Sequence, residues 1–215
     1  TSITALLIDV TDPISEITET DLRNRFDEIR DSIPVGGQIV IYELTADVGK
    51  LNQALLRCNP GSGEQADELI SNPRSIQKRW EEGFDAPLAQ IAADIGNGTS
   101  GDRSPILAGI QTINLKAFGH HDYARLPKRL IVASDMIEHT ADFSMYRSGI
   151  KYDRFQATPA PAKFRTPLDD VDIEIWEFNR SGVAFSSIEL SVFWKKWLDD
   201  NGAKSTSFFQ LQGVE

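Results

Sequence analysis

Cysteine and long apolar segments are scarce in this chain. Its 215 residues contain one cysteine, Cys58, so no disulfide can form within the chain, which fits a reducing compartment without establishing one. No stretch approaches the roughly 20 apolar residues that a membrane-spanning helix needs, so we expect no insertion into a membrane. The chain begins at Thr1 without a methionine, so an upstream signal or anchor could be missing and the localisation stays open.

Basic clusters are also missing. The chain has 22 Lys and Arg residues against 32 Asp and Glu residues, a formal net charge of −10, and no run of basic residues. Because phosphate binding needs clustered Lys and Arg, the composition argues against a nucleic-acid partner. The acidic residues are spread along the chain, which is typical of a soluble surface.

Sequence motifs of several enzyme classes are absent, and we assign no catalytic residue. There is no glycine motif that cradles phosphate and no Gly-x-Ser-x-Gly elbow. A phosphotransferase of the haloacid dehalogenase type needs an aspartate two positions after Asp9, where this chain has Thr11, with Asp12 one position later. An isochorismatase-like enzyme needs a late nucleophilic cysteine, whereas Cys58 lies in a predicted edge strand.

Apolar periodicity predicts strands and helices that alternate along the chain. Continuous apolar runs are typical of strands that are buried on both faces, and stripes at helical spacing are typical of amphipathic helices. The first predicted strand ends near Asp9. The other five predicted strands cover 38–44, 51–57, 130–133, 171–178 and 206–211. The predicted helices cover 15–33, 73–95 with an interruption at Pro87, 105–118 and 187–200, and the segment 138–170 is less regular.

This order predicts an α/β fold of the doubly wound, Rossmann-like kind. We expect a mostly parallel six-stranded sheet with helices on both faces. A short connection between the second and third strands favours a hairpin, which makes 51–57 an antiparallel edge strand. The length and pattern indicate a single domain over 1–215.

Polar side chains gather at the expected carboxyl edge of this sheet. Asp9, Thr11 and Asp12 follow the first strand, Asp135 follows the fourth, and Ser104 begins a helix after a flexible loop. Ligands of open α/β sheets bind at this edge. Carboxylate and hydroxyl oxygens are ligands of hard cations such as Mg²⁺. The sequence therefore predicts a cation site or a phosphate-handling site at this edge.

These segments resemble the metal-ion-dependent adhesion site of the von Willebrand factor A family. Asp-Val-Thr-Asp-Pro at 9–13 aligns with the family's Asp-x-Ser-x-Ser motif, Ser-Pro-Ile-Leu at 104–107 looks like its Thr-Pro-Leu segment, and Ser-Asp at 134–135 looks like its Thr-Asp-Gly turn. The resemblance implies a non-enzymatic module that holds Mg²⁺, or Mn²⁺ or Ca²⁺, at an open site that another protein's carboxylate completes. The implied metal ligands are Asp9, Thr11, Ser104 and Asp135.

Two positions depart from the family pattern. Pro13 stands where the family has its second Ser, and Ser15 could replace that hydroxyl only if the turn were reshaped. Met136 stands where the family has Gly. A metal-free scaffold domain of a larger assembly is therefore one alternative, and a Mg²⁺-dependent phosphohydrolase that uses Asp9 as nucleophile or metal ligand is another.

A purely structural interpretation also stays open. Asp9, Asp12 and Asp135 could each cap a strand-to-helix turn, where free N–H groups favour carboxylates. His139 is expected near the same edge, and the irregular segment 138–170 is our candidate for a partner-specific surface. His120 and His121 are expected at a solvated helix end.

Overall fold

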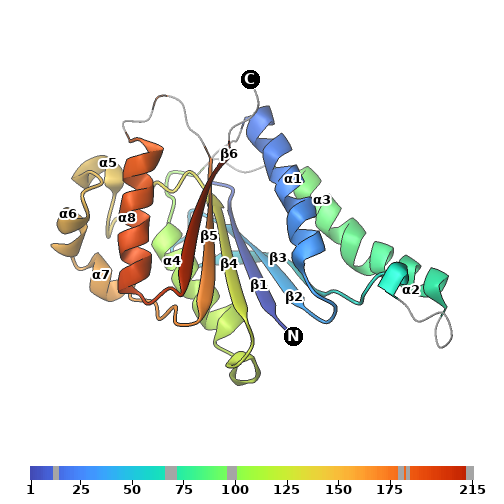
Figure 1. Ribbon diagram of the computed structural model, residues 1–215. Coiled ribbons are helices and arrows are strands. Elements are labelled where there is room, and N and C mark those ends of the chain that lie inside the picture. The colour runs from blue at the N-terminus through green and yellow to red at the C-terminus, as the bar shows by residue number, and fades with distance from the viewer. Residues whose placement is uncertain (12–14, 66–71, 96–100, 179–181, 183–184, 212–215) are drawn as a thin grey trace.

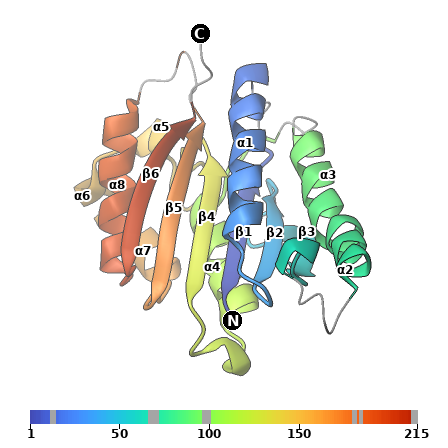
Figure 2. The ribbon, with the colours of Figure 1, turned by 45° about the vertical axis from the view of Figure 1, so that its right-hand side comes forward.

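The computed structural model describes residues 1–11, 15–65, 72–95, 101–178, 182 and 185–211. Its sheet has the strand order β3-β2-β1-β4-β5-β6, which can be followed from one side to the other in Figure 2. All neighbouring strands are parallel except β2 and β3, which are antiparallel at one edge. The strands are β1 (Ile3–Asp9), β2 (Gln38–Leu44), β3 (Leu51–Cys58), β4 (Lys128–Ser134), β5 (Val171–Phe178) and β6 (Ser205–Leu211).

This arrangement confirms the predicted fold class, while the prediction of one domain stays a prediction. Figure 1 shows the sheet between two layers of helices, with α1 and α3 on one face and α4 and α8 on the other. All seven residues of β1 are buried, because apolar side chains pack against helices on both faces of the sheet.

The first helical layer contains α1 (Glu16–Ser32), α2 (Pro73–Trp80), the π-helical turn η2 (Glu81–Asp85) and α3 (Ala86–Asp94). Ser15 caps α1 by accepting a hydrogen bond from the Thr18 N–H at 3.1 Å. Thr18 and Asp21 have the spacing of a capping box, but Thr18 lies inside the helix and does not cap it. The predicted interruption at Pro87 is confirmed, since η2 ends and α3 begins directly before this proline, which lacks an N–H donor.

The second layer is built from α4 (Ile106–Ile113), its π-helical extension η4 (Asn114–Phe118) and α8 (Ser187–Asp200). A capping box of Ser186 and Glu189 stands at the start of α8, where the sequence predicts a helix over 187–200. The aromatic stripe of α8 is fully buried and belongs to the core: Phe193, Trp194 and Trp197. The short turns η1 (Gly63–Gln65) and η5 (His121–Tyr123) lie in connections.

The segment 138–170 is more ordered than the sequence indicates. It contains three short helices, α5 (Met145–Ser148), α6 (Tyr152–Gln156) and α7 (Ala160–Lys163). They pack beside α8 (Figure 1). Just before them, Phe143 stacks on Phe193 of α8 with ring centroids 5.9 Å apart. The sequence does not predict these helices, because each is too short for a helical period to repeat and prolines interrupt the segment. No helix among the described residues is long and apolar enough to cross a membrane.

Candidate functional site

The ends of β1 and β4 lie side by side at the carboxyl edge of the sheet. Their register pairs Ile8 with Ala133, so the residues that follow, Asp9 and Ser134, are neighbours across the two strands. Ser104 reaches the same place from the segment before α4. It is held there by two backbone hydrogen bonds. The Ser104 N–H donates to the His139 carbonyl at 3.1 Å, and the His139 N–H donates to the Ser104 carbonyl at 3.0 Å.

The carboxylate of Asp9 is the centre of this cluster. Its Oδ1 accepts from the Thr11 N–H at 3.0 Å and from the Thr11 hydroxyl at 2.5 Å. Its Oδ2 accepts from the hydroxyl of Ser104 at 2.7 Å and from that of Ser134 at 2.8 Å. All four residues are buried, so these hydrogen bonds replace water that the groups lost on folding.

The hydrogen bonds also orient the hydroxyl oxygens. Each hydroxyl has one proton and two lone pairs, and Thr11, Ser104 and Ser134 each use the proton on Asp9. The lone pairs of Thr11 and Ser104 therefore remain as acceptors beside a carboxylate. Hydroxyl and carboxylate oxygens are the ligand types that hard cations take, so the chemistry of this donor set fits a cation such as Mg²⁺.

Asp135 lies at the same edge, one residue after Ser134. Its Oδ1 accepts from the Ile137 N–H at 2.9 Å, and the Ser134 hydroxyl accepts from the Met136 N–H at 3.0 Å. Two consecutive side chains thus close the turn after β4 by bonding backbone two residues ahead. This is the turn-stabilising role of the structural interpretation. The role of Asp135 as a metal ligand stays a prediction.

The turn after β4 has a backbone conformation that favours glycine, although a methionine stands there. Met136 has φ +60°, in the left-handed region that favours glycine. Its carbonyl accepts a hydrogen bond from Trp194 Nε1 at 2.7 Å, and its side chain is buried. The chain therefore keeps the glycine-type turn while filling the space beside it with an apolar side chain.

Two buried polar residues of the site, Ser134 and Glu138, were not among the predicted metal ligands. Ser134 could have been found, because it ends β4 in register with Asp9 and must share its face of the sheet. Glu138 gave no signal in the sequence. Its Oε2 accepts from the Leu107 N–H at 2.9 Å, so it caps α4 from a distant segment.

Glu138 is fully buried, and its other carboxyl oxygen has no hydrogen-bond partner among the described residues. Burial raises the pKa of Glu138 to about 8, against the opposing effect of the hydrogen bond from Leu107 and with a smaller raising effect of the Asp9 charge. The carboxyl group is therefore protonated near neutral pH, which spares the site an unpaired buried charge.

The other residues that the sequence places near this site have different outcomes. Asp12 and Pro13 lie outside the described residues. The hydroxyl of Ser15 is used at the start of α1. His139 lies next to Ser104, as expected, and its Nδ1 is 2.8 Å from the Ser144 hydroxyl. The described part of the chain has no group of three or more His, Cys, Asp or Glu side chains arranged to hold a metal.

No protein-family profile matches the chain, and no curated protein matches it. Three solved structures with a similar backbone are the SpRpn10 VWA domain, BatB from Bacteroides thetaiotaomicron, and proximal thread matrix protein 1 from the mussel byssus with a zinc-occupied MIDAS motif. Their sequence identities are 10%, 10% and 11% and their TM-scores 0.49, 0.44 and 0.48. The similarity covers 98%, 100% and 99% of this chain and 89%, 92% and 44% of theirs.

These values carry no inference about function, and the class of the fold follows from the strand order itself. A mostly parallel six-stranded sheet with one antiparallel hairpin, β2–β3, at its edge and helices on both faces is a von Willebrand factor A-like α/β fold.

Proposed function

We propose that this chain is a non-enzymatic protein-interaction module that binds a carboxylate of a partner protein through a divalent cation. Asp9, Thr11, Ser104 and Asp135 would hold the cation at the carboxyl edge of the sheet. When bound, the cation supplies an electrophilic position that a partner carboxylate can fill. The observation that carries the proposal is the convergence of the Thr11 and Ser104 hydroxyls on the carboxylate of Asp9.

The hydrogen bonds of Asp9 favour this function over a phosphohydrolase. A nucleophilic carboxylate needs an oxygen that is free to attack phosphorus. Both oxygens of Asp9 already accept two hydrogen bonds each, at 2.5 to 3.0 Å. These bonds suit a carboxylate that orients hydroxyl ligands, and they lower its reactivity as a nucleophile.

Thermal unfolding with and without cations tests the proposal. After treatment with EDTA, the wild-type chain is titrated with Mg²⁺, Mn²⁺ and Ca²⁺. A cation that binds only the folded state stabilises it by about 2.7 kcal/mol at a concentration 100 times its Kd, so the unfolding midpoint should rise. In Thr11→Val and Asp135→Asn, which each remove a ligand at nearly constant volume, the rise should shrink or vanish.

Asp172→Asn is the matched control, since it removes one carboxylate at the opposite end of β5 and should keep the full rise. Asp9→Ala is a poorer probe because it leaves three buried hydroxyls without an acceptor and destabilises the fold with or without cation. If no cation shifts the wild-type midpoint, the metal-free scaffold becomes the better account. Turnover of p-nitrophenyl phosphate that Asp9→Asn abolishes would instead establish the phosphohydrolase.

A further inference from the structure

A pocket lies at the amino end of the parallel strands, opposite to the end that carries Asp9. It has a volume of about 340 Å³ and is lined by the end of α1, the connection to β2, the segment after β3, and α2. This is the end where β2 begins at Gln38 and β3 ends at Cys58, which pair in register. We call it the basal pocket. Its size is at the lower end of the range for small-ligand sites.

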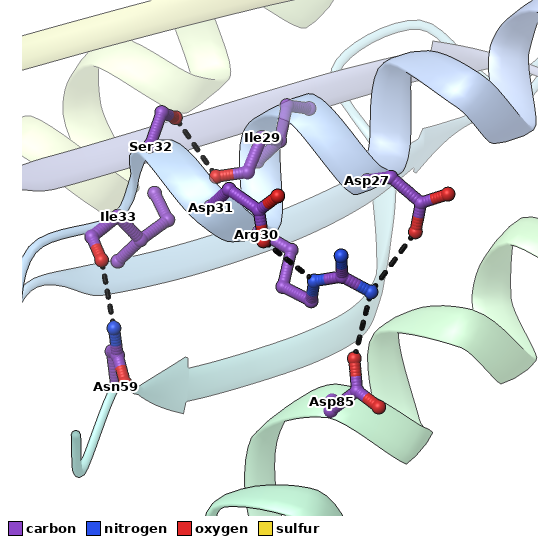
Figure 3. Close-up of polar contacts among 8 residues, drawn as sticks. All are labelled: Asp27, Ile29, Arg30, Asp31, Ser32, Ile33, Asn59 and Asp85. Carbon is purple, nitrogen blue, oxygen red and sulfur yellow. Dashed lines mark hydrogen bonds and ion pairs between the residues drawn. The ribbon is translucent and has the colours of Figure 1, made fainter. Parts of the chain in front are cut away.

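Hydrogen bonds of Asn59 build the floor of the basal pocket. The buried Asn59 side chain donates to the Ile33 carbonyl at 2.7 Å and accepts from the Gly61 N–H at 2.9 Å (Figure 3 shows the contact with Ile33). Its backbone N–H and C=O bond to Gly37 and Gly36 at 2.9 and 2.8 Å. One side chain and its backbone thus join three segments, so the pocket exists before any ligand arrives.

The wall formed by α2 is equally well defined. The Gly63 N–H donates to Gln77 Oε1 at 2.9 Å. A Cβ on Gly63 would lie 2.6 Å from the Pro73 carbonyl oxygen, so the loop and α2 are in direct backbone contact. The wall therefore cannot move inward without breaking this packing.

The charge of the basal pocket is negative in spite of its arginine. The Arg30 guanidinium is surrounded by three carboxylates, as Figure 3 shows, with distances of 2.9 Å to Asp31, 3.0 Å to Asp27 and 3.0 Å to Asp85. Glu64 adds a carboxylate that has no ion pair among the described residues. The carbonyl end of α1, which carries a partial negative charge, also lies here. A cation is therefore favoured over an anion.

Trp80 gives the pocket an aromatic wall. It is half-buried, whereas the other three tryptophans of the chain are fully buried: Trp176, Trp194 and Trp197. A half-buried indole beside the carboxylates of Glu64 and the ion-paired Asp31 is suited to a planar cation, because a guanidinium stacks on an aromatic face and bonds a carboxylate through two N–H groups.

We propose that the basal pocket binds the guanidinium group of an arginine side chain presented by a partner protein. The guanidinium stacks on Trp80 and donates hydrogen bonds to Glu64 and Asp31, while the alkyl stem passes Val35, which is 49% exposed at the rim. The chain's net charge of −10 favours approach of a basic partner. This site is independent of the proposed cation site, because the two lie at opposite ends of the parallel strands.

Titration of the full chain with acetyl-Gly-Arg-Gly-amide tests the proposal. Amide chemical shifts of Asn59, Gly61 and Gly63 are followed by NMR at 150 mM salt. We expect saturable shifts, and at least tenfold weaker binding of the peptide in which neutral citrulline replaces arginine. A lysine peptide should bind more weakly than the arginine peptide, because an ammonium lacks the planar fork of N–H donors of a guanidinium.

Glu64→Gln should lower the affinity for the arginine peptide at least fivefold, and Trp80→Leu should do the same. Glu82→Gln is the matched control, because it removes the same charge from a nearby exposed position outside the pocket and should change the affinity by less than twofold. The proposal fails if no saturable shift occurs, if citrulline binds as well as arginine, or if Glu82→Gln weakens binding as much as Glu64→Gln. Glu64 makes no hydrogen bond in the described structure, so its variant tests binding without loss of the fold.

Discussion

Met136 combines a backbone conformation suited to glycine with a side chain that belongs to the core. Its φ of +60° costs a residue with a Cβ about 1–2 kcal/mol, and its side chain is buried. The strained turn is held by the Trp194 hydrogen bond to its carbonyl and by the Ser134 hydroxyl that receives its N–H. The turn at the candidate site is therefore maintained by tertiary contacts, and the local sequence would favour another conformation.

At position 136 a glycine variant should be more stable than an alanine variant, which is the reverse of the usual order of stability. Both Met136→Ala and Met136→Gly lose buried side-chain contacts, at a cost of about 2–5 kcal/mol. Because glycine relieves the strain at positive φ, Met136→Gly should be the more stable of the two by about 1 kcal/mol in urea unfolding. Met145 is the control. It is equally buried but helical, so its alanine variant should be the more stable. If alanine and glycine variants have the same order of stability at Met136 and Met145, the backbone at Met136 is not strained.

At the scale of elements, α4 is the helix that connects the site to the core. It begins two residues after Ser104, and its Leu107 N–H is capped by Glu138 from another segment. Its approach to the sheet depends on Gly109. A Cβ at this position would lie 2.8 Å from Leu44 Cδ1 and 3.0 Å from Leu7 Cδ2. The glycine therefore lowers helix propensity in exchange for close contact with β1 and β2.

Alanine at Gly109 should destabilise the fold although alanine is the better helix former. Overpacking against Leu7 and Leu44 costs about 1–3 kcal/mol, which exceeds the gain of roughly 1 kcal/mol in helix propensity. Gly83→Ala is the matched control, since nothing lies within 4 Å of the added Cβ and the residue is exposed. Its free energy of unfolding should stay the same or rise. Equal effects at both glycines would contradict the close packing of α4.

At the scale of the whole molecule, two apolar cores lie on the two faces of one sheet, and Glu138 and Glu177 are buried carboxyl groups whose pKa is raised. Burial raises the pKa of Glu138 to about 8 and also raises the pKa of Glu177. Ion pairing acts in the opposite direction at the surface, where the hydrogen bond from Lys204 lowers the pKa of Asp172. The buried and the exposed carboxyl groups therefore change stability in different pH ranges.

The stability of the chain should fall as the pH rises from about 5 to 8. The folded form keeps Glu138 protonated up to a pKa of about 8, while the unfolded chain ionises near the model value of 4.5. The stabilisation is thus complete below pH 4.5 and is lost as the pH rises through 8, with a change on the order of a few kcal/mol. Urea unfolding at pH 5, 6.5 and 8 measures it.

Glu138→Gln should flatten this dependence, leaving a smaller slope from Glu177. The exposed Glu28→Gln is the control and should keep the wild-type slope. An unchanged slope in Glu138→Gln would show that another group carries the pH dependence.

The sequence predicted most of the elements because their signals are local. The strand before Asp9, the helix that begins at 73 and the helix over 187–200 are each found where expected. Thr11 and Ser104, which were predicted as metal ligands with Asp9, both bond its carboxylate, and their role as ligands stays a prediction. The short helices in 138–170 were missed because one turn of helix carries no periodic pattern.

The sequence by itself determined the α/β class, the antiparallel edge strand, and which polar residues follow β1 and β4, because strand and helix periods and turn residues are properties of neighbouring positions. Only the tertiary structure decided that Ser134 joins Asp9, that Glu138 caps α4 as a protonated carboxyl, and that Arg30, Glu64 and Trp80 meet in the basal pocket. Each of these contacts joins residues that are far apart in the chain or on different elements. They depend on strand register and helix packing, which no local pattern specifies.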